Sequence, residues 1–263
     1  MNPKPEETGT VAHYTKLEHL ANVLGDKRLL IGAVANLQDP RESSMTWIDT
    51  VGIGLDPHAS SRHLADLMIS RASTQIRLLS TAGERSPEKG SDWIEESPYG
   101  RPRMWSQYGD SSRGFCVVLD RELLKAEIQM LAHQPEYVMA DAVSYHPWLH
   151  NVGGNITIET GANIEIDLDQ PFSVLNHNQM MRSIYFKKST DWQAESEYRY
   201  LLFSMVDGPI FVSIERATKY VVLGTQFPDN QISQAQSLCR GLDCNLYWLQ
   251  YQHPRYTLHH LET

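Results

Sequence analysis

Two glutamates near residue 195 are the strongest indication of chemistry in this sequence. They lie in Glu195-Ser-Glu197-Tyr-Arg199, which opens an apolar run that continues to Phe203. In a strand, residues two apart point to the same face, so Glu195 and Glu197 would share one face. Like charges at that spacing raise the pKa of at least one carboxyl, which costs stability unless a site uses it. A solvated strand edge is the alternative, but the run to Phe203 favours a strand inside a sheet.

A second motif, His13-Tyr-Thr15, lies where a short strand ending at His13 passes into a helix. Thr15 and Glu18 have the T-x-x-E spacing of a capping box, in which the threonine oxygen accepts from the first-turn amides. The capping box would fix Thr15 and place the imidazole of His13 at the end of the strand. A structural histidine beside a helix cap is the alternative interpretation.

A third motif, Trp105-Ser-Gln-Tyr108-Gly109, is followed closely by Arg113-Gly114. Aromatic residues three apart on a helical turn share a face, so Trp105 and Tyr108 could form a wall. A planar ring could stack against such a wall. Plain core packing is the alternative, because aromatic side chains on one helix face are often buried.

Other common kinds of site are disfavoured. The eleven histidines include the pairs His146/His150 and His259/His260, but neither pair has zinc-site spacing, and no metal is expected. The chain has no P-loop, no G-x-G-x-x-G and no G-x-S-x-G motif. A net charge of −9 argues against broad nucleic-acid binding.

The three cysteines do not form a disulfide framework, which fits a reducing compartment. No signal region is found, and no run reaches the roughly 18 apolar residues of a membrane helix. We therefore expect a cytoplasmic protein that does not bind a membrane.

Hydrophobic periodicity predicts the elements that must position these motifs. Helices are expected at about 15–24, 61–73, 121–133, 173–187 and 229–240. Strands are expected at 11–13, 76–79, 114–119, 137–145, 197–203, 210–214, 220–224 and 245–251. Long loops are expected near 83–103 and 146–169, within one domain spanning 1–263. Helices early and strands crowded late predict an α+β fold with a mostly antiparallel central sheet flanked by helices.

Taken together, the motifs resemble an uncharacterised bacterial family, domain of unknown function 2971 (DUF2971). The resemblance rests on His13-Tyr-Thr, Asp39-Pro-x-Glu42, Met104-Trp-x-x-Tyr-Gly with Gly114-Phe, and Trp192-x-x-Glu195-x-Glu197-Tyr-Arg. It covers nearly the whole chain. The family name implies no activity.

A more distant resemblance is to the ADP-ribosyltransferase fold. A strand with His-x-Thr, an immediate helix containing Leu-x-x-Val-Leu and then Leu29-Leu30 is similar to the opening of that fold. Glu197-Tyr198 at a strand start is similar to its catalytic glutamate, and Glu195-x-Glu197 to its E-x-E variant. The resemblance implies a split central sheet that binds NAD, with ADP-ribose passed to an acceptor.

The same resemblance implies roles for individual residues. His13 would hold the adenosine ribose of NAD, Tyr108 would stack on nicotinamide, and Ser80-Thr81 would match a serine-rich strand. Thr15 and Arg113 complete the expected NAD-binding set. Glu197 would stabilise the oxocarbenium-like transition state, and Glu195 would orient or deprotonate the acceptor.

Two other functions remain open at this point. One is a non-catalytic nucleotide-binding or sensor module on the same scaffold. The other is a hydrolase or nuclease that uses Glu195, Glu197 and Asp39 around a divalent ion. The acceptor of an ADP-ribosyltransferase could be a protein, a nucleic acid, a small molecule or water. A toxin or phage-defence role would suit a bacterial protein with this chemistry.

Overall fold

A computed structural model describes residues 9–37, 43, 48–52, 70, 74–86, 92–132, 137–147, 156–160 and 178–263. Its strands are β1 (Thr10–Thr15), β2 (Arg28–Ala33), β3 (Ile48–Gly52), β4 (Ile76–Gly83), β5 (Phe115–Asp120), β6 (Val138–Ala142), β7 (Ser144–His146), β8 (Ile156–Thr160), β9 (Lys187–Ser189), β10 (Glu197–Phe203), β11 (Ile210–Ser213), β12 (Thr218–Leu223), β13 (Asn245–Gln252) and β14 (Arg255–Leu261). Its α-helices are α3 (Trp93–Glu96), α4 (Pro102–Gln107), α5 (Arg121–Gln129), α7 (Asn178–Tyr185) and α8 (Asp229–Gly241). Short 3₁₀ or π turns are η1 (Leu17–His19), η2 (Ala21–Gly25), η3 (Val34–Asn36) and η5 (Thr190–Glu195).

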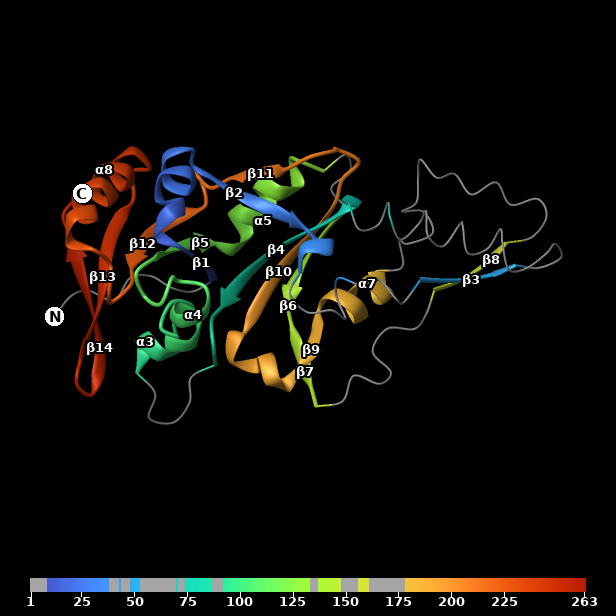
Figure 1. Ribbon diagram of the computed structural model, residues 1–263, viewed down its shortest axis with the longest axis horizontal. Helices are drawn as coiled ribbons and strands as arrows, with labels where there is room; N and C mark the ends of the chain where they lie inside the picture. The colour runs from blue at the N-terminus through green and yellow to red at the C-terminus, as the bar shows by residue number, and fades with distance from the viewer. Residues whose placement is uncertain are drawn as a thin grey trace.

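A ten-stranded sheet organises the described residues (Figure 1). Its main path runs β11-β2-β4-β1-β5-β12-β13-β14, and β10 adds to β4 and carries β6. All of its pairings are antiparallel except that of β12 with β13. The expected α+β class with a mostly antiparallel sheet is confirmed at this level.

Alternating side chains of the central strands bury two apolar layers on opposite faces of the sheet. Val117 and Leu119 of β5 join one layer with Leu124 of α5 and Ala235 of α8. Cys116 and Val118 of β5 join the other layer, which also contains these residues of α3, α4 and the segment between them: Ile94, Tyr99, Met104 and Trp105. This period-2 pattern is the one expected when helices cover both faces of a sheet.

The sheet is split beside β4. Along one edge β4 pairs with β10 from Ile76 to Ala82. Along its other edge, β4 pairs with β2 near Leu78 and with β1 near Ala82. Between these two contacts, residues 79–81 of β4 pair with no described strand on that edge. β1 and β2 therefore diverge there and leave a gap in the sheet.

The helix expected directly after His13 is replaced by other structure. Thr15 is the last residue of β1 and pairs with Phe115, so it cannot cap a helix. The cap position of η1 is Lys16, which makes no side-chain capping bond, and η2 follows with π geometry. The predicted Thr15–Glu18 capping box is wrong because the strand ladder extends two residues beyond His13.

Other expectations have mixed outcomes. The predicted helices at 121–133 and 229–240 correspond to α5 and α8, and the predicted strand at 197–203 corresponds to β10. The expected loop at 83–103 is wrong in part, because it contains α3, begun by a capping box between Asp92 and Glu95. Asp39-Pro40 of the family motif and most of the predicted helix at 61–73 lie outside the described residues. No helix among the described residues is both long enough and apolar enough to cross a membrane.

Candidate functional site

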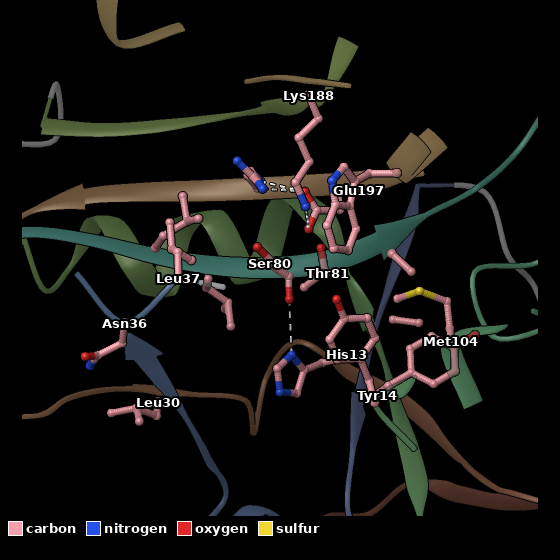
Figure 2. A pocket seen from close by; sticks show the side chains of 17 residues that line it. His13, Tyr14, Leu30, Asn36, Leu37, Ser80, Thr81, Met104, Lys188 and Glu197 are labelled. Atoms are coloured by element: carbon pink, nitrogen blue, oxygen red, sulfur yellow. Dashed lines mark hydrogen bonds and ion pairs between the residues drawn. The ribbon is translucent and has the colours of Figure 1, made fainter. Parts of the chain in front are cut away.

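A cavity of about 290 Å³ opens at the split in the sheet. Eight elements or their flanking segments contribute side chains to it: β1, β2, η3, β4, α4, β9, η5 and β10. His13, Ser80, Tyr108 and Glu197 all line this one cavity. Figure 2 shows His13 and Glu197 approaching it from different strands, with Ser80 and Thr81 between them. The structure thus brings together four of the seven site residues that the sequence predicts.

His13 extends across the gap between β1 and β4. Its Nδ1 lies 3.3 Å from the carbonyl oxygen of Ser80, which can only accept, so Nδ1 carries the proton and donates. Burial lowers the pKa of His13 below its usual value, and the bond to Ser80 opposes this shift only partly. The imidazole is therefore neutral near pH 7 and keeps Nε2 as an acceptor. A neutral imidazole so arranged can accept a hydrogen bond from a ligand hydroxyl.

The unpaired stretch of β4 supplies the floor of the cavity. The hydroxyl of Thr81 is already used, because it donates to the carbonyl oxygen of Tyr198 across the β4–β10 pairing at 2.7 Å. The hydroxyl of Ser80 makes no hydrogen bond to another described residue. Ser80 therefore offers a free hydroxyl beside the Nδ1-anchored histidine.

Glu197 lies at the start of β10 with both carboxylate oxygens ion-paired. Its Oε2 accepts from Arg199 at 2.7 Å, and its Oε1 lies 3.3 Å from the ammonium of Lys188. Only about 8% of Glu197 is exposed, yet it lines the cavity together with both cations. Two charged partners hold the carboxylate in one orientation beside the opening.

Glu195 does not share a strand face with Glu197, contrary to the sequence interpretation. It ends η5, and Ser196 between the two glutamates has left-handed backbone (φ 43°) that turns the chain into β10. Glu195 is fully buried and does not line the cavity. Lys188 lies 3.2 Å from its Oε2 and bridges the two carboxylates. A lysine between the two glutamates replaces the direct like-charge contact expected from sequence.

Glu195 instead fixes Tyr108. The phenol of Tyr108 donates to Oε1 of Glu195 at 2.9 Å. Burial raises the pKa of Tyr108 well above its usual range, and the Glu195 carboxylate adds to the shift, so the phenol stays protonated and donates. Arg101 holds the backbone of Glu195 in place. Its Nη1 donates to the Glu195 backbone oxygen at 2.6 Å, and its Nη2 donates to the backbone oxygen of Gly83. Burial lowers the pKa of Arg101 to about 10, and its guanidinium remains charged at neutral pH.

The two aromatic residues of the α4 motif separate. Tyr108 lines the cavity, whereas Trp105 is buried in the core, where it packs edge-on against Tyr14 and donates to the carbonyl of Tyr99. Tyr14 of β1 and Trp192 of η5 also line the cavity, and the Lys188 ammonium lies 4.6 Å from the centre of the Trp192 ring. The expected wall of Trp105 and Tyr108 is therefore wrong.

Thr15 and Arg113 lie outside the cavity. Thr15 is buried in the β1–β5 pairing, and Arg113 is exposed in the turn that precedes β5. Close packing explains why residue 114 is a glycine, because a Cβ there would overlap the carbonyl oxygen of Thr15. Arg113 and Gly114 therefore belong to the turn that leads into β5, and neither binds a ligand in this cavity.

Lys188 and Trp192 line the cavity, but neither was predicted from the sequence as a site residue. Lys188 is buried at about 5% exposure, and a lysine so buried is rare without partners. In the sequence it follows Lys187 in an ordinary polar run, so no local signal distinguishes it. Among the described residues, no three His, Cys, Asp or Glu side chains gather as a metal site would require. Asp39, the third carboxylate of the metal hypothesis, lies outside the described residues.

Part of the chain matches a known protein family. Residues 104–200, which run from α4 to β10, match the family described as "Protein of unknown function (DUF2971)". The segment contains Tyr108, Lys188, Glu195 and Glu197. No curated protein and no solved structure matches the chain.

Proposed function

We propose that this member of the DUF2971 family cleaves the nicotinamide–ribose bond of NAD and transfers ADP-ribose to an acceptor. One observation carries the proposal. An imidazole, a phenol and a carboxylate from three distant stretches, at His13, Tyr108 and Glu197, line one cavity in a split sheet. The volume of about 290 Å³ lies just below the range of ligand sites, about 300–1,000 Å³, and suits a nucleoside-sized part of a dinucleotide.

The reaction needs few catalytic groups. The ribose C1′–nitrogen bond breaks, and its electron pair passes to the nicotinamide nitrogen, so a cationic ring leaves as a neutral molecule without a general acid. An acceptor atom then bonds to C1′ and releases its proton to solvent. Positive charge develops on the ribose between these events, and a fixed carboxylate beside it lowers the barrier.

Glu197 is the group best suited to that task. It is the carboxylate at the cavity, and its orientation is held by Arg199 at 2.7 Å and Lys188 at 3.3 Å. A carboxylate already held by the protein needs no reorganisation as charge develops, which favours the transition state. Glu195 is sealed from the cavity, so we assign it the positioning of Tyr108 rather than contact with an acceptor.

The remaining lining suits a planar base and the ribose hydroxyls of a dinucleotide. Tyr108 and Trp192 offer ring faces or edges for the planar base. The Nε2 of His13 and the free hydroxyl of Ser80 suit ribose hydroxyls, one as acceptor and one as donor or acceptor. Leu37 and Met104 add apolar surface that limits water at the reacting bond. Contacts of this kind supply the proximity on which the reaction depends.

The test is nicotinamide release from NAD by purified wild-type and Glu197→Gln protein, measured by chromatography. Loss of a transition-state electrostatic group costs about a hundredfold or more in rate, so we expect at least that decrease. Glu127→Gln is the matched control. Glu127 is also buried and ion-paired, with Arg216 at 3.1 Å, but it lies on α5 away from the cavity.

Glu197→Gln removes the ion pairs with Arg199 and Lys188, and Glu127→Gln removes the pair with Arg216, so thermal unfolding of each variant is measured to separate misfolding from lost chemistry. A folded Glu197→Gln protein that releases nicotinamide as fast as wild type would refute the proposed role. Wild-type protein that binds NAD without turnover would refute catalysis but not binding.

A second candidate function is a non-catalytic nucleotide-binding module. The observation that favours it is the complete pairing of Glu197, whose two oxygens are both engaged by cations within the chain. In that case NAD would raise the melting temperature by mass action with no nicotinamide released. The same two measurements, melting temperature and nicotinamide, decide between the candidates.

A further inference from the structure

A second hollow, of about 770 Å³, lies at the other side of β10 from the first cavity. Tyr198, which lines it, lies on the face of the sheet that α5 covers, and Arg121 of α5 packs over its ring. The Glu197 side chain points to the opposite face of the sheet. Glu197 borders both spaces. The hollow is also lined by the end of β4, the start of β1, part of β6 and the turn between η5 and β10.

Arg85 presents a fixed guanidinium to this hollow. Its Nε donates to the Ser196 hydroxyl at 3.0 Å and its Nη2 to the Ala194 carbonyl at 2.5 Å. Its Nη1 donates to no residue in the described part of the chain. The anchored group is planar and already oriented, so little side-chain entropy is lost when a ligand binds.

Arg121 presents a second guanidinium from the first turn of α5. Its guanidinium carbon lies 5.3 Å from the centre of the Tyr198 ring, and its Nε donates to Glu122 at 3.2 Å. Within the ranges that the structure covers, its two Nη groups have no acceptor. Stacking on an aromatic ring leaves the edge of a guanidinium available for oxygen ligands.

Three acidic side chains line the hollow, Glu84, Asp141 and Glu197, and each accepts at least one hydrogen bond or ion pair from within the chain. Glu84 accepts from both the backbone nitrogen and the hydroxyl of Thr10, at 2.7 and 3.0 Å. Asp141 is ion-paired with Arg182. The space therefore offers more free donors than free acceptors, which calls for a ligand rich in acceptor oxygens.

Tyr145 adds a further donor. Its hydroxyl oxygen accepts from the backbone nitrogen of Glu197 at 2.8 Å, which leaves its hydrogen to donate. Burial raises the pKa of Tyr145 to about 12, so the phenol is protonated at neutral pH.

We propose that this hollow is a second ligand site and that it binds a phosphate-bearing molecule through Arg85 and Arg121, with Tyr145 as an additional donor. Phosphate supplies several charged oxygens, and arginine matches them in geometry better than a point charge does. A carboxylate has only two oxygens and is the weaker fit for two separate guanidinium groups. Because Arg85 is tied to Ala194 and Ser196, a ligand there contacts the segment that carries Glu195 and Glu197.

The test is calorimetric titration of the full chain with inorganic pyrophosphate, phosphoserine and succinate. Pyrophosphate represents a free phosphate compound, phosphoserine a phosphate carried on a side chain, and succinate a dicarboxylate. We expect binding of at least one phosphate compound, weakened roughly tenfold or more by Arg121→Gln, since a charged hydrogen bond is lost. Binding should also weaken as salt rises.

Two control variants keep the result specific. Arg113→Gln removes the same charge from an exposed arginine outside both spaces and should leave binding unchanged. His13→Asn alters only the first cavity and should also leave binding unchanged. Succinate binding as tightly as the phosphate compounds, or equal losses in the Arg113 and Arg121 variants, would overturn the proposal. Loss of binding in His13→Asn would move the ligand to the first cavity and overturn it too.

This experiment stands apart from the NAD proposal. Absence of phosphate binding would leave the nicotinamide-release result of Glu197→Gln untouched. Absence of nicotinamide release would leave the phosphate titration untouched.

Discussion

Tyr108 and Glu195 should be energetically coupled, and a double-mutant cycle with Tyr108→Phe and Glu195→Gln measures the coupling. The phenol donates to a fully buried carboxylate at 2.9 Å, and Glu195 has no exposed surface at which solvent could replace that donor. A hydrogen bond to a charged group contributes about 1.5–3 kcal/mol, so Tyr108→Phe should destabilise the fold by that amount. In a chain of roughly this size, this corresponds to a melting temperature lower by about 3–12 °C.

The assay is denaturant unfolding of the wild type, both single variants and the double variant. Tyr198→Phe is the matched control, because the Tyr198 hydroxyl makes no hydrogen bond to any described residue and its loss should change stability by under about 0.5 kcal/mol. The coupling energy between Tyr108 and Glu195 should exceed about 1 kcal/mol. Additive single effects, within about 0.5 kcal/mol, would refute the assigned contact.

The same four proteins test the positioning role. If Glu195 acts only by holding Tyr108, the two single variants should change nicotinamide release by similar factors, and the double variant should be no slower than either. A Glu195→Gln protein much slower than Tyr108→Phe, with the double variant slower still, would give Glu195 a role of its own.

Two further predictions concern His13 and Gly114. Because burial places the folded-state pKa of His13 below its usual 6.5, stability should be complete above about pH 6.5 and fall as pH drops through the lowered pKa. His13→Asn, whose side-chain amide can still donate to Ser80, should lack this loss in pH-dependent melting, and an unchanged profile would contradict the neutral imidazole. Gly114→Ala should destabilise the chain by about 1–3 kcal/mol in denaturant unfolding, because the added Cβ meets the Thr15 carbonyl, and a neutral effect would show that the turn can shift.

Much of the fold was predictable because its signals are local. The strand at 197–203 and the helices that became α5 and α8 each show their hydrophobic period within one segment. The beginning of the chain was not predictable in the same way. Thr15 and Glu18 satisfy a capping pattern, but pairing with Phe115 along β5 keeps Thr15 extended. A long-range strand contact therefore overrode a local preference.

The candidate site was predictable only in part for the same reason. His13, Ser80, Tyr108 and Glu197 were chosen by residue type and motif, and all four line the cavity. Lys188 was missed because a buried lysine looks like any other lysine in the sequence.

The sequence by itself determined the strand at 197–203, the helices that became α5 and α8, and which residue types are available for chemistry, because those properties depend on neighbours along the chain. Only the tertiary structure decided that β1 and β2 diverge beside β4, that Lys188 lies between Glu195 and Glu197, and that Glu195 is sealed from the cavity. These facts depend on strand pairing and burial between residues far apart in the chain. A left-handed Ser196 was enough to place two glutamates, separated by one residue, in different surroundings.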